Sequence, residues 1–174
     1  MSIMAIGNRA VVAQLLLTGA LWCLGFTSAL GQGPSRPRFD ELSPKDTAQL
    51  DRQRAVIATI VKQRYGSSLF HSTKDLPVLQ RLIDDAAFNK SQTYELQSLG
   101  VAFGDVLSSA LPLHWVMITD EYGTDPTLRY KRTSVNVNAL TMISKRVERG
   151  ERVNLSELLR ITREQLTNVE EKSR

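Results

Sequence analysis

Apolar residues recur every three or four positions along much of the chain, which is the spacing of one face of an α-helix. Two of the periodic stretches open with helix-start signals. Ser43-Pro44-Lys45-Asp46 combines an N-cap serine, a first-turn proline and an acidic residue, and Asn154 is followed by the capping-box residue Glu157. The pattern predicts helices around residues 43–66, 75–86, 94–110 and 139–149, and from 154 onward.

The period changes after Pro112, where short β-favouring runs alternate with turn residues. The predicted strands are Trp115–Ile118, Leu128–Tyr130 and Thr133–Asn138. In the last of these, apolar and polar residues alternate, as expected for an antiparallel sheet with one covered face. The order of elements along the chain is helices, then a small three-stranded antiparallel sheet, then helices again. This order predicts a single α+β domain whose core is closed by a C-terminal helix.

Gly100 and Gly104 lie four residues apart, on one face of the predicted helix around 94–110. Each glycine costs about 1 kcal/mol relative to alanine inside a helix, so the pair needs a reason. One interpretation is that another helix or a strand crosses there at close range. The alternative is a ligand that lies against the bare backbone.

The N-terminal thirty residues resemble a secretory signal. Arg9 is followed by an apolar run from Ala10 to Phe26 and then by small residues, with cleavage expected after Ala29 or Gly31. The predicted boundaries are a signal peptide at 1–31, a Pro- and Gly-containing linker at 32–42 and a domain at 43–174. The protein is therefore predicted to be periplasmic or secreted. The alternative is an uncleaved membrane anchor, since the apolar run approaches the length of a bilayer span.

Composition narrows the chemistry of the mature chain. The only cysteine, Cys23, lies inside the predicted signal, so cleavage leaves a cysteine-free chain without disulfides or thiolate chemistry. Loss of Arg9 from the 22 basic residues, against 18 acidic ones, leaves a net charge of +3, which gives no reason to expect nucleic acid. The two histidines are too far apart for a paired-histidine zinc motif. No cofactor, metal site or catalytic residue is predicted.

An acidic turn holds the first group of candidate binding residues, Asp120, Glu121 and Asp125. Carboxylates around a glycine can bind calcium, but the spacing does not match an EF-hand loop. One carboxylate could act as a general acid or base if its pKa were shifted by its surroundings. The alternative is a solvated turn in which Asp side chains bond nearby backbone amides.

A basic cluster holds the second group of candidates, Lys145, Arg146 and Arg149. Because glutamates are interleaved with these cations, one interpretation is a solvated helix end. The alternative is that the cations bind an acidic partner, either a protein surface or anionic lipid. Because only a short meander separates the two groups, we expect Asp120 or Glu121 to form an ion pair with one of these cations.

Several segments together resemble a bacterial family of domains of uncharacterised function. Its members share the order LGxxFGD … WVMxxDEYG … TMISKRVERGE, found here within Leu96–Asp105, Trp115–Gly123 and Leu140–Glu151. The likeness spans about residues 76–159. Members often have a proline where this chain has Ala139. The resemblance implies one α+β domain and no specific activity, so it assigns no catalytic residue.

The predicted function is therefore that of an exported, non-enzymatic binding or interaction domain for an unknown ligand. Its partner is unknown, a protein of the cell envelope being one candidate, and membrane contact is expected only through the N-terminal segment if it stays uncleaved. The alternative function is a hydrolase-like enzyme that uses carboxylates of the 120–125 turn.

Overall fold

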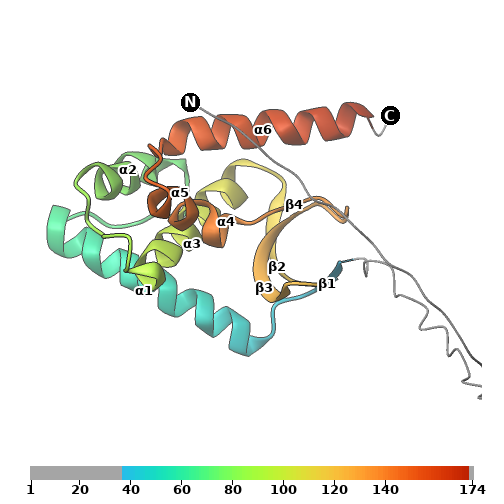
Figure 1. Cartoon of the computed structure of the whole chain (residues 1–174), viewed down its shortest axis with the longest axis horizontal. Coiled ribbons are helices and arrows are strands. Elements are labelled where there is room, and N and C mark those ends of the chain that lie inside the picture. Colours follow the sequence, from blue (N-terminus) through green and yellow to red (C-terminus); the bar gives the residue numbers. More distant parts are fainter. Residues whose placement is uncertain (1–36, 173–174) are drawn as a thin grey trace, which may run out of the picture. The chain divides into compact units, whose positions relative to one another are not determined.

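A four-stranded antiparallel sheet and a set of helices make up the part of the chain that the structure describes, residues 37–172 (Figure 1). The structure is a computed structural model. Within it the strands and helices form one compact α+β domain. The predicted signal peptide, its cleavage point and Cys23 lie outside the described residues.

The sheet has the strand order β1-β2-β3-β4, with β1 at Arg38–Asp40, β2 at Leu113–Asp120, β3 at Gly123–Tyr130 and β4 at Asn136–Val137. The prediction of three strands is wrong, because β1 pairs with β2 and places Phe39 opposite Ile118. A strand of three residues is too short to show the alternation of apolar and polar residues that predicts a strand. β1 therefore forms because it pairs with β2 and not because of a local sequence signal.

The hairpin of β2 and β3 is longer than its turn residues suggested. Only Glu121 and Tyr122 form the turn, and residues 123–126 continue as strand. Pro126 lies opposite Met117 of β2, and on the other side of β3 the strand β4 reaches only Leu128 and Arg129. The missing N–H of Pro126 therefore costs no hydrogen bond to β4.

The first helix, α1 (Pro44–Tyr65), begins and ends where its caps predicted. Ser43 and Asp46 form the capping box, and Gly66 ends the helix in the left-handed conformation at φ 65°. A short 3₁₀ segment, η1 (Thr73–Asp75), then leads into α2 (Leu76–Asp84). This helix ends earlier than its apolar spacing suggested, since Ala86 has a positive φ of 47°.

The central helix is α3 (Thr93–Ala110), which is buried on almost all sides from Ser98 to Leu107. Helix α1, α2 and the following short helices pack around it, and β2 contacts it from the sheet. A helix with so little exposed surface can carry a polar side chain in its middle only if other elements supply partners for that side chain.

The two glycines of α3 allow this close packing, which confirms the first of the two interpretations. A Cβ atom added at Gly100 would lie 2.4 Å from the backbone oxygen of Leu140, and one at Gly104 would lie 2.3 Å from the Trp115 ring. The glycine face is therefore covered by protein.

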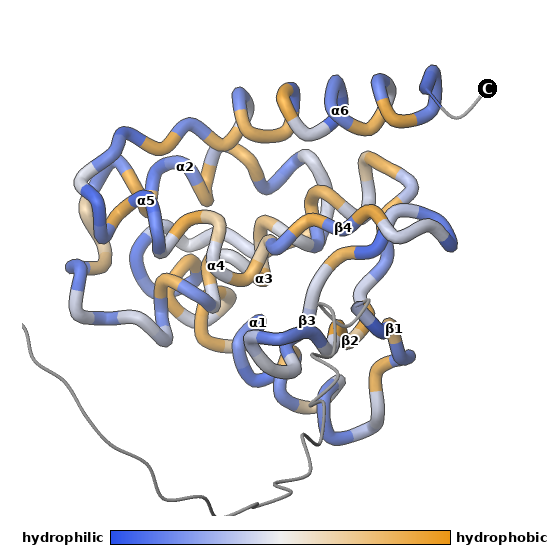
Figure 2. Tube along the Cα trace, turned by 45° about the vertical axis from the view of Figure 1, so that its right-hand side comes forward, coloured by the Kyte–Doolittle hydropathy of each residue, from blue (hydrophilic) through white to orange (hydrophobic). Residues whose placement is uncertain are grey.

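The segment after the sheet forms two short helices instead of the one predicted, α4 (Ala139–Met142) and α5 (Ser144–Glu148), with Ile143 between them. The last helix, α6 (Leu155–Lys172), begins after the cap at Asn154, whose side chain accepts a hydrogen bond from the Glu157 amide at 3.0 Å. Most apolar residues of α6 lie on the side that faces the other helices (Figure 2). At its far end, Glu170 accepts hydrogen bonds from Tyr130 and Lys131.

Among the helices between residues 37 and 172, none is both long enough and apolar enough to cross a bilayer.

Candidate functional site

Asp105 is one of two carboxylates buried among the described residues. It follows Gly104 in the middle of α3 and its side chain is 8% exposed. A buried carboxylate is costly unless charged or hydrogen-bonding groups surround it.

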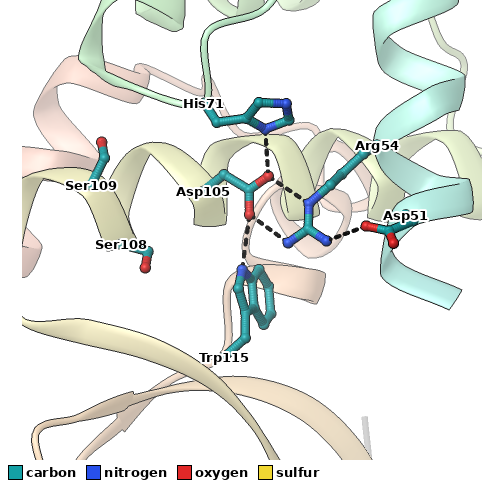
Figure 3. A pocket seen from close by; sticks show the side chains of 7 residues that line it. All are labelled: Asp51, Arg54, His71, Asp105, Ser108, Ser109 and Trp115. Atoms are coloured by element: carbon teal, nitrogen blue, oxygen red, sulfur yellow. Dashed lines mark hydrogen bonds and ion pairs between the residues drawn. The ribbon is translucent and has the colours of Figure 1, made fainter. Parts of the chain in front are cut away.

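Three different segments supply those groups (Figure 3). Arg54 of α1 forms a two-pronged ion pair, with Nε 2.8 Å from Oδ2 and Nη2 2.8 Å from Oδ1. Trp115 of β2 donates its indole N–H to Oδ1 at 2.9 Å. His71, in the loop between α1 and η1, places Nδ1 2.9 Å from Oδ2. Asp105 therefore ties α1, the sheet and this loop to the central helix.

The surroundings of Asp105 act on its pKa in opposite directions. Burial raises the pKa, whereas the hydrogen bonds and charge of Arg54, with the bonds from His71 and Trp115, lower it. The lowering prevails, so the pKa lies below its ordinary value of 3.8 and the group is an anion at neutral pH. Asp105 raises the pKa of Arg54 in turn, although burial opposes this effect.

An ionised Asp105 determines that Nδ1 of His71 carries the hydrogen shared between them. A carboxylate can only accept, so Nδ1 must donate the hydrogen between them. In the neutral ring Nε2 then has a lone pair, and since the side chain is 54% exposed this atom is accessible to a ligand. Figure 3 shows the other edge of the ring turned away from Asp105.

The loop of His71 is itself held in an uncommon conformation. His71 has a positive φ of 52°, which costs a non-glycine residue of the order of 1–3 kcal/mol. The buried carboxylate of Asp75 accepts hydrogen bonds from the amides of Phe70 (2.9 Å) and Ser72 (3.2 Å), one on each side of His71. His71 is thus held in two ways: Asp75 fixes the backbone on either side of it, and Asp105 fixes its ring.

These side chains line an open pocket with a volume of about 530 Å³. Its lining residues come from α1, the loop after it, α3 and β2: Asp51, Arg54, His71, Asp105, Ser108, Ser109 and Trp115. The serine hydroxyls are engaged elsewhere, because Ser108 donates to the Leu113 carbonyl and Ser109 to the Val106 carbonyl, each at 2.8 Å.

When His71 is neutral, the pocket has one more negative charge than positive charges. Asp51 is 63% exposed and accepts one bond from Arg54 Nη1 at 2.9 Å, through Oδ1. With a neutral His71, the two carboxylates of Asp51 and Asp105 face the single guanidinium of Arg54. Asp51 Oδ2 and, in a neutral ring, His71 Nε2 remain as acceptors, and Arg54 keeps one further N–H on each of its two Nη atoms as donors.

The predicted acidic site is a hairpin tip. Asp120 ends β2, and its side chain accepts a hydrogen bond from the Tyr122 amide at 2.8 Å, which is the local turn role considered above. Glu121 and Asp125 are exposed, Asp125 lying opposite Ile118 in β3. No group of three or more His, Cys, Asp or Glu side chains within residues 37–172 is arranged to hold a metal ion.

The predicted cations lie elsewhere, and the expected ion pairs with the acidic turn are absent from the described residues. Arg149 binds Glu151 instead, and Arg146 donates to the Met142 carbonyl at 2.7 Å. Lys145 is exposed. All three line a separate cavity beside α4 and α5.

Sequence reasoning missed the pocket of Asp105. Its members are far apart in the chain, with Arg54 51 and His71 34 positions before Asp105. One signal was present, since a single carboxylate within the apolar run around Phe103 to Leu107 has to find partners inside the core.

Comparison with known proteins finds a match to one family model over part of the chain and a structure with a similar fold. Residues 75–158 match the model of a domain of unknown function, DUF3806. This agrees with the expected likeness to an uncharacterised family. The matched region contains Asp105 and Trp115, whereas Arg54 and His71 precede it.

A crystal structure from Bacteroides thetaiotaomicron is similar in fold, with a TM-score of 0.66 at 16% sequence identity. The match covers 74% of this chain and 47% of that chain, so this protein spans about half the length of that structure. No curated protein matches the sequence. Neither likeness names an activity.

Proposed function

We propose that this protein is an exported, non-enzymatic binding domain whose ligand docks in the pocket of Asp105. The observation on which this rests is the fixed orientation of His71: a buried carboxylate holds Nδ1 at 2.9 Å while half of the side chain stays exposed. A hydrogen-bonding group set in advance by a buried network is typical of a recognition site, because little ordering remains to oppose binding.

The pocket favours a ligand that donates hydrogen bonds and bears a positive charge. Its accessible acceptors are His71 Nε2 and Asp51 Oδ2, and its net charge is negative when His71 is neutral. The indole of Trp115 also lines the pocket, and an aromatic ring can attract a cation. An ammonium group on a hydroxylated small molecule has this combination of features.

The Asp105–His71 pair also favours a second candidate function, general-base catalysis, since a carboxylate commonly orients a catalytic imidazole in this way. The two pocket serines argue against a serine nucleophile, because both hydroxyls donate to backbone carbonyls. The carboxylates of the 120–125 turn are exposed or engaged in the turn, so the hydrolase alternative based on them gains no support.

Imidazole NMR signals provide a direct test of the binding proposal. The chain has two histidines, so His114 serves as an internal reference for His71. Titration with ethanolamine or glucosamine should shift the His71 signals saturably and leave those of His114 unchanged, whereas acetate should act on neither. Asp51→Asn should weaken the response, and His114→Gln should preserve it. Equal responses of both histidines, or none from His71, would contradict the proposal.

Export is a separate proposal, supported by the Arg9–apolar–small pattern of the first 31 residues. Intact-mass measurement of protein from the extracytoplasmic fraction should show a mature chain that begins at Leu30 or Gln32 and lacks a thiol. A full-length species in the membrane fraction would show that the segment is an anchor instead.

A further inference from the structure

A second cavity, separate from the pocket of Asp105, lies where β4, α4, α5 and α6 meet. Its volume is about 350 Å³. None of the described residues that line it is acidic, and all but two have a polar or charged side chain: Asn136, Val137, Asn138, Thr141, Met142, Lys145, Arg146, Arg149, Thr162 and Gln165.

Three cations converge on this cavity, and their charge is only partly balanced. Arg149 forms a two-pronged pair with Glu151, at 2.5 and 3.1 Å. Arg146 donates from Nη1 to the Met142 carbonyl at 2.7 Å, which anchors the guanidinium without neutralising it. Lys145 is exposed, and the described residues give it no ion-pair partner.

Asn138 adds oriented hydrogen-bond donors. Its Oδ1 caps α4 by accepting from the Thr141 amide at 3.4 Å and from the Thr141 hydroxyl at 3.2 Å. Since the oxygen is engaged with the helix, the side-chain NH₂ is the group left for another partner. Gln165 of α6 lines the same space and offers a second amide.

We infer that this cavity binds a phosphate group, either as a soluble phosphate or within a lipid headgroup. Lysine and arginine side chains with amide donors form charge-assisted hydrogen bonds to phosphate oxygens, which are stronger than bonds between neutral groups. The absence of an acidic lining residue among the described ones favours a small oxyanion over a cation. This site is independent of the one proposed for His71.

A titration with inorganic phosphate, at constant ionic strength balanced with chloride, tests the inference. Backbone amide NMR signals of residues 136–149 should shift saturably. Lys145→Gln and Arg146→Gln should each weaken binding by about tenfold, the loss expected for one charged hydrogen bond. Lys45→Gln, which removes the same charge from the exposed start of α1, is the matched control and should bind as the parent protein does.

A second arm identifies the source of the phosphate. Vesicles of phosphatidylcholine alone are compared by sedimentation with vesicles that also contain phosphatidylglycerol. Retention on the anionic vesicles alone, lost in Lys145→Gln but kept in Lys45→Gln, supports the site and assigns it to a headgroup. Saturable binding of inorganic phosphate without retention supports the site with a soluble ligand. If neither probe binds, or if both lysine variants lose binding equally, the inference is overturned.

The outcome does not depend on the pocket of Asp105. His71→Gln should leave phosphate binding unchanged, so failure of one proposal is distinguishable from failure of the other.

Discussion

At the scale of single residues, Asp105 links the stability of the domain to its candidate site. Its carboxylate is surrounded by donors from Arg54, His71 and Trp115, and the first two of these belong to segments that are distant in the chain. The same bonds that offset the cost of burying this charge also orient the accessible imidazole. Loss of the carboxylate should therefore affect both stability and ligand recognition.

Asp105→Asn should destabilise the domain by about 3 kcal/mol. Removal of one partner of a buried ion pair leaves the other charge poorly compensated, and Arg54, only 22% exposed, would remain in place. Chemical denaturation measures the loss. Asp51→Asn is the matched control, because its carboxylate is 63% exposed and an exposed pair contributes about 0–1 kcal/mol. Equal effects of the two variants would contradict a special role for Asp105.

The lowered pKa of Asp105 predicts how the difference in unfolding free energy between the parent protein and Asp105→Asn depends on pH. Because the pKa is lowered in the folded state, the stabilisation is fully present above the ordinary value of 3.8 and is lost as pH falls through the folded value. The gap in unfolding free energy between the parent protein and Asp105→Asn should hold at neutral pH and narrow below about pH 4. Denaturation curves between pH 3 and 7 check this, and a gap independent of pH would contradict it.

At the scale of secondary-structure elements, boundaries set by local sequence signals could be predicted, whereas elements that form through long-range contacts could not. The caps at Ser43, Gly66 and Asn154 lie next to the helices they limit, so these boundaries could be predicted from the sequence. Strand β1 was missed because a three-residue strand forms only through its pairing with β2. The break at Ile143 divides a stretch whose periodic pattern predicted one helix.

The candidate site was missed for the same physical reason. Arg54, His71 and Asp105 belong to three segments, and only the packing of α1 and the loop after it against α3 brings them together. The glycines at 100 and 104 were nevertheless interpretable from the sequence, because an unfavourable residue repeated on one helix face indicates a close approach.

Gly100→Ala tests the close packing of α4 against α3. The new Cβ would lie 2.4 Å from the backbone oxygen of Leu140 and 2.6 Å from that of Ala139, so α4 would have to move. We expect a loss of about 1–3 kcal/mol by denaturation, even though alanine is the better helix former. An unchanged or higher stability would show that α4 adjusts freely.

Gly104→Ala is the companion variant, since its Cβ would meet the ring of Trp115 rather than backbone. It should displace the indole from Asp105. In protein without its first 31 residues, Trp115 is the remaining tryptophan, so its fluorescence reports this change directly. Gly100→Ala should alter the emission less.

At the scale of the whole domain, the buried core extends beyond the region that matches the family model. Helix α1 precedes residues 75–158 and contributes Leu50, Ile57 and Val61, all fully buried. Most of α6 follows Leu158 and adds the buried residues Leu159 and Leu166, so the core depends on segments outside the match.

A fragment of residues 75–158 should therefore fail to fold cooperatively. Each fully buried aliphatic side chain lost with α1 removes about 1.5–3 kcal/mol, so the three together approach the 5–15 kcal/mol by which domains are usually stable. The fragment would also leave Asp105 buried without Arg54 and His71. Thermal unfolding followed by circular dichroism should show a sharp transition for residues 37–172 and none for 75–158. A cooperative transition in the shorter fragment would show that α1 is an accessory to the fold, and that Asp105 can be satisfied without its partners from the preceding segments.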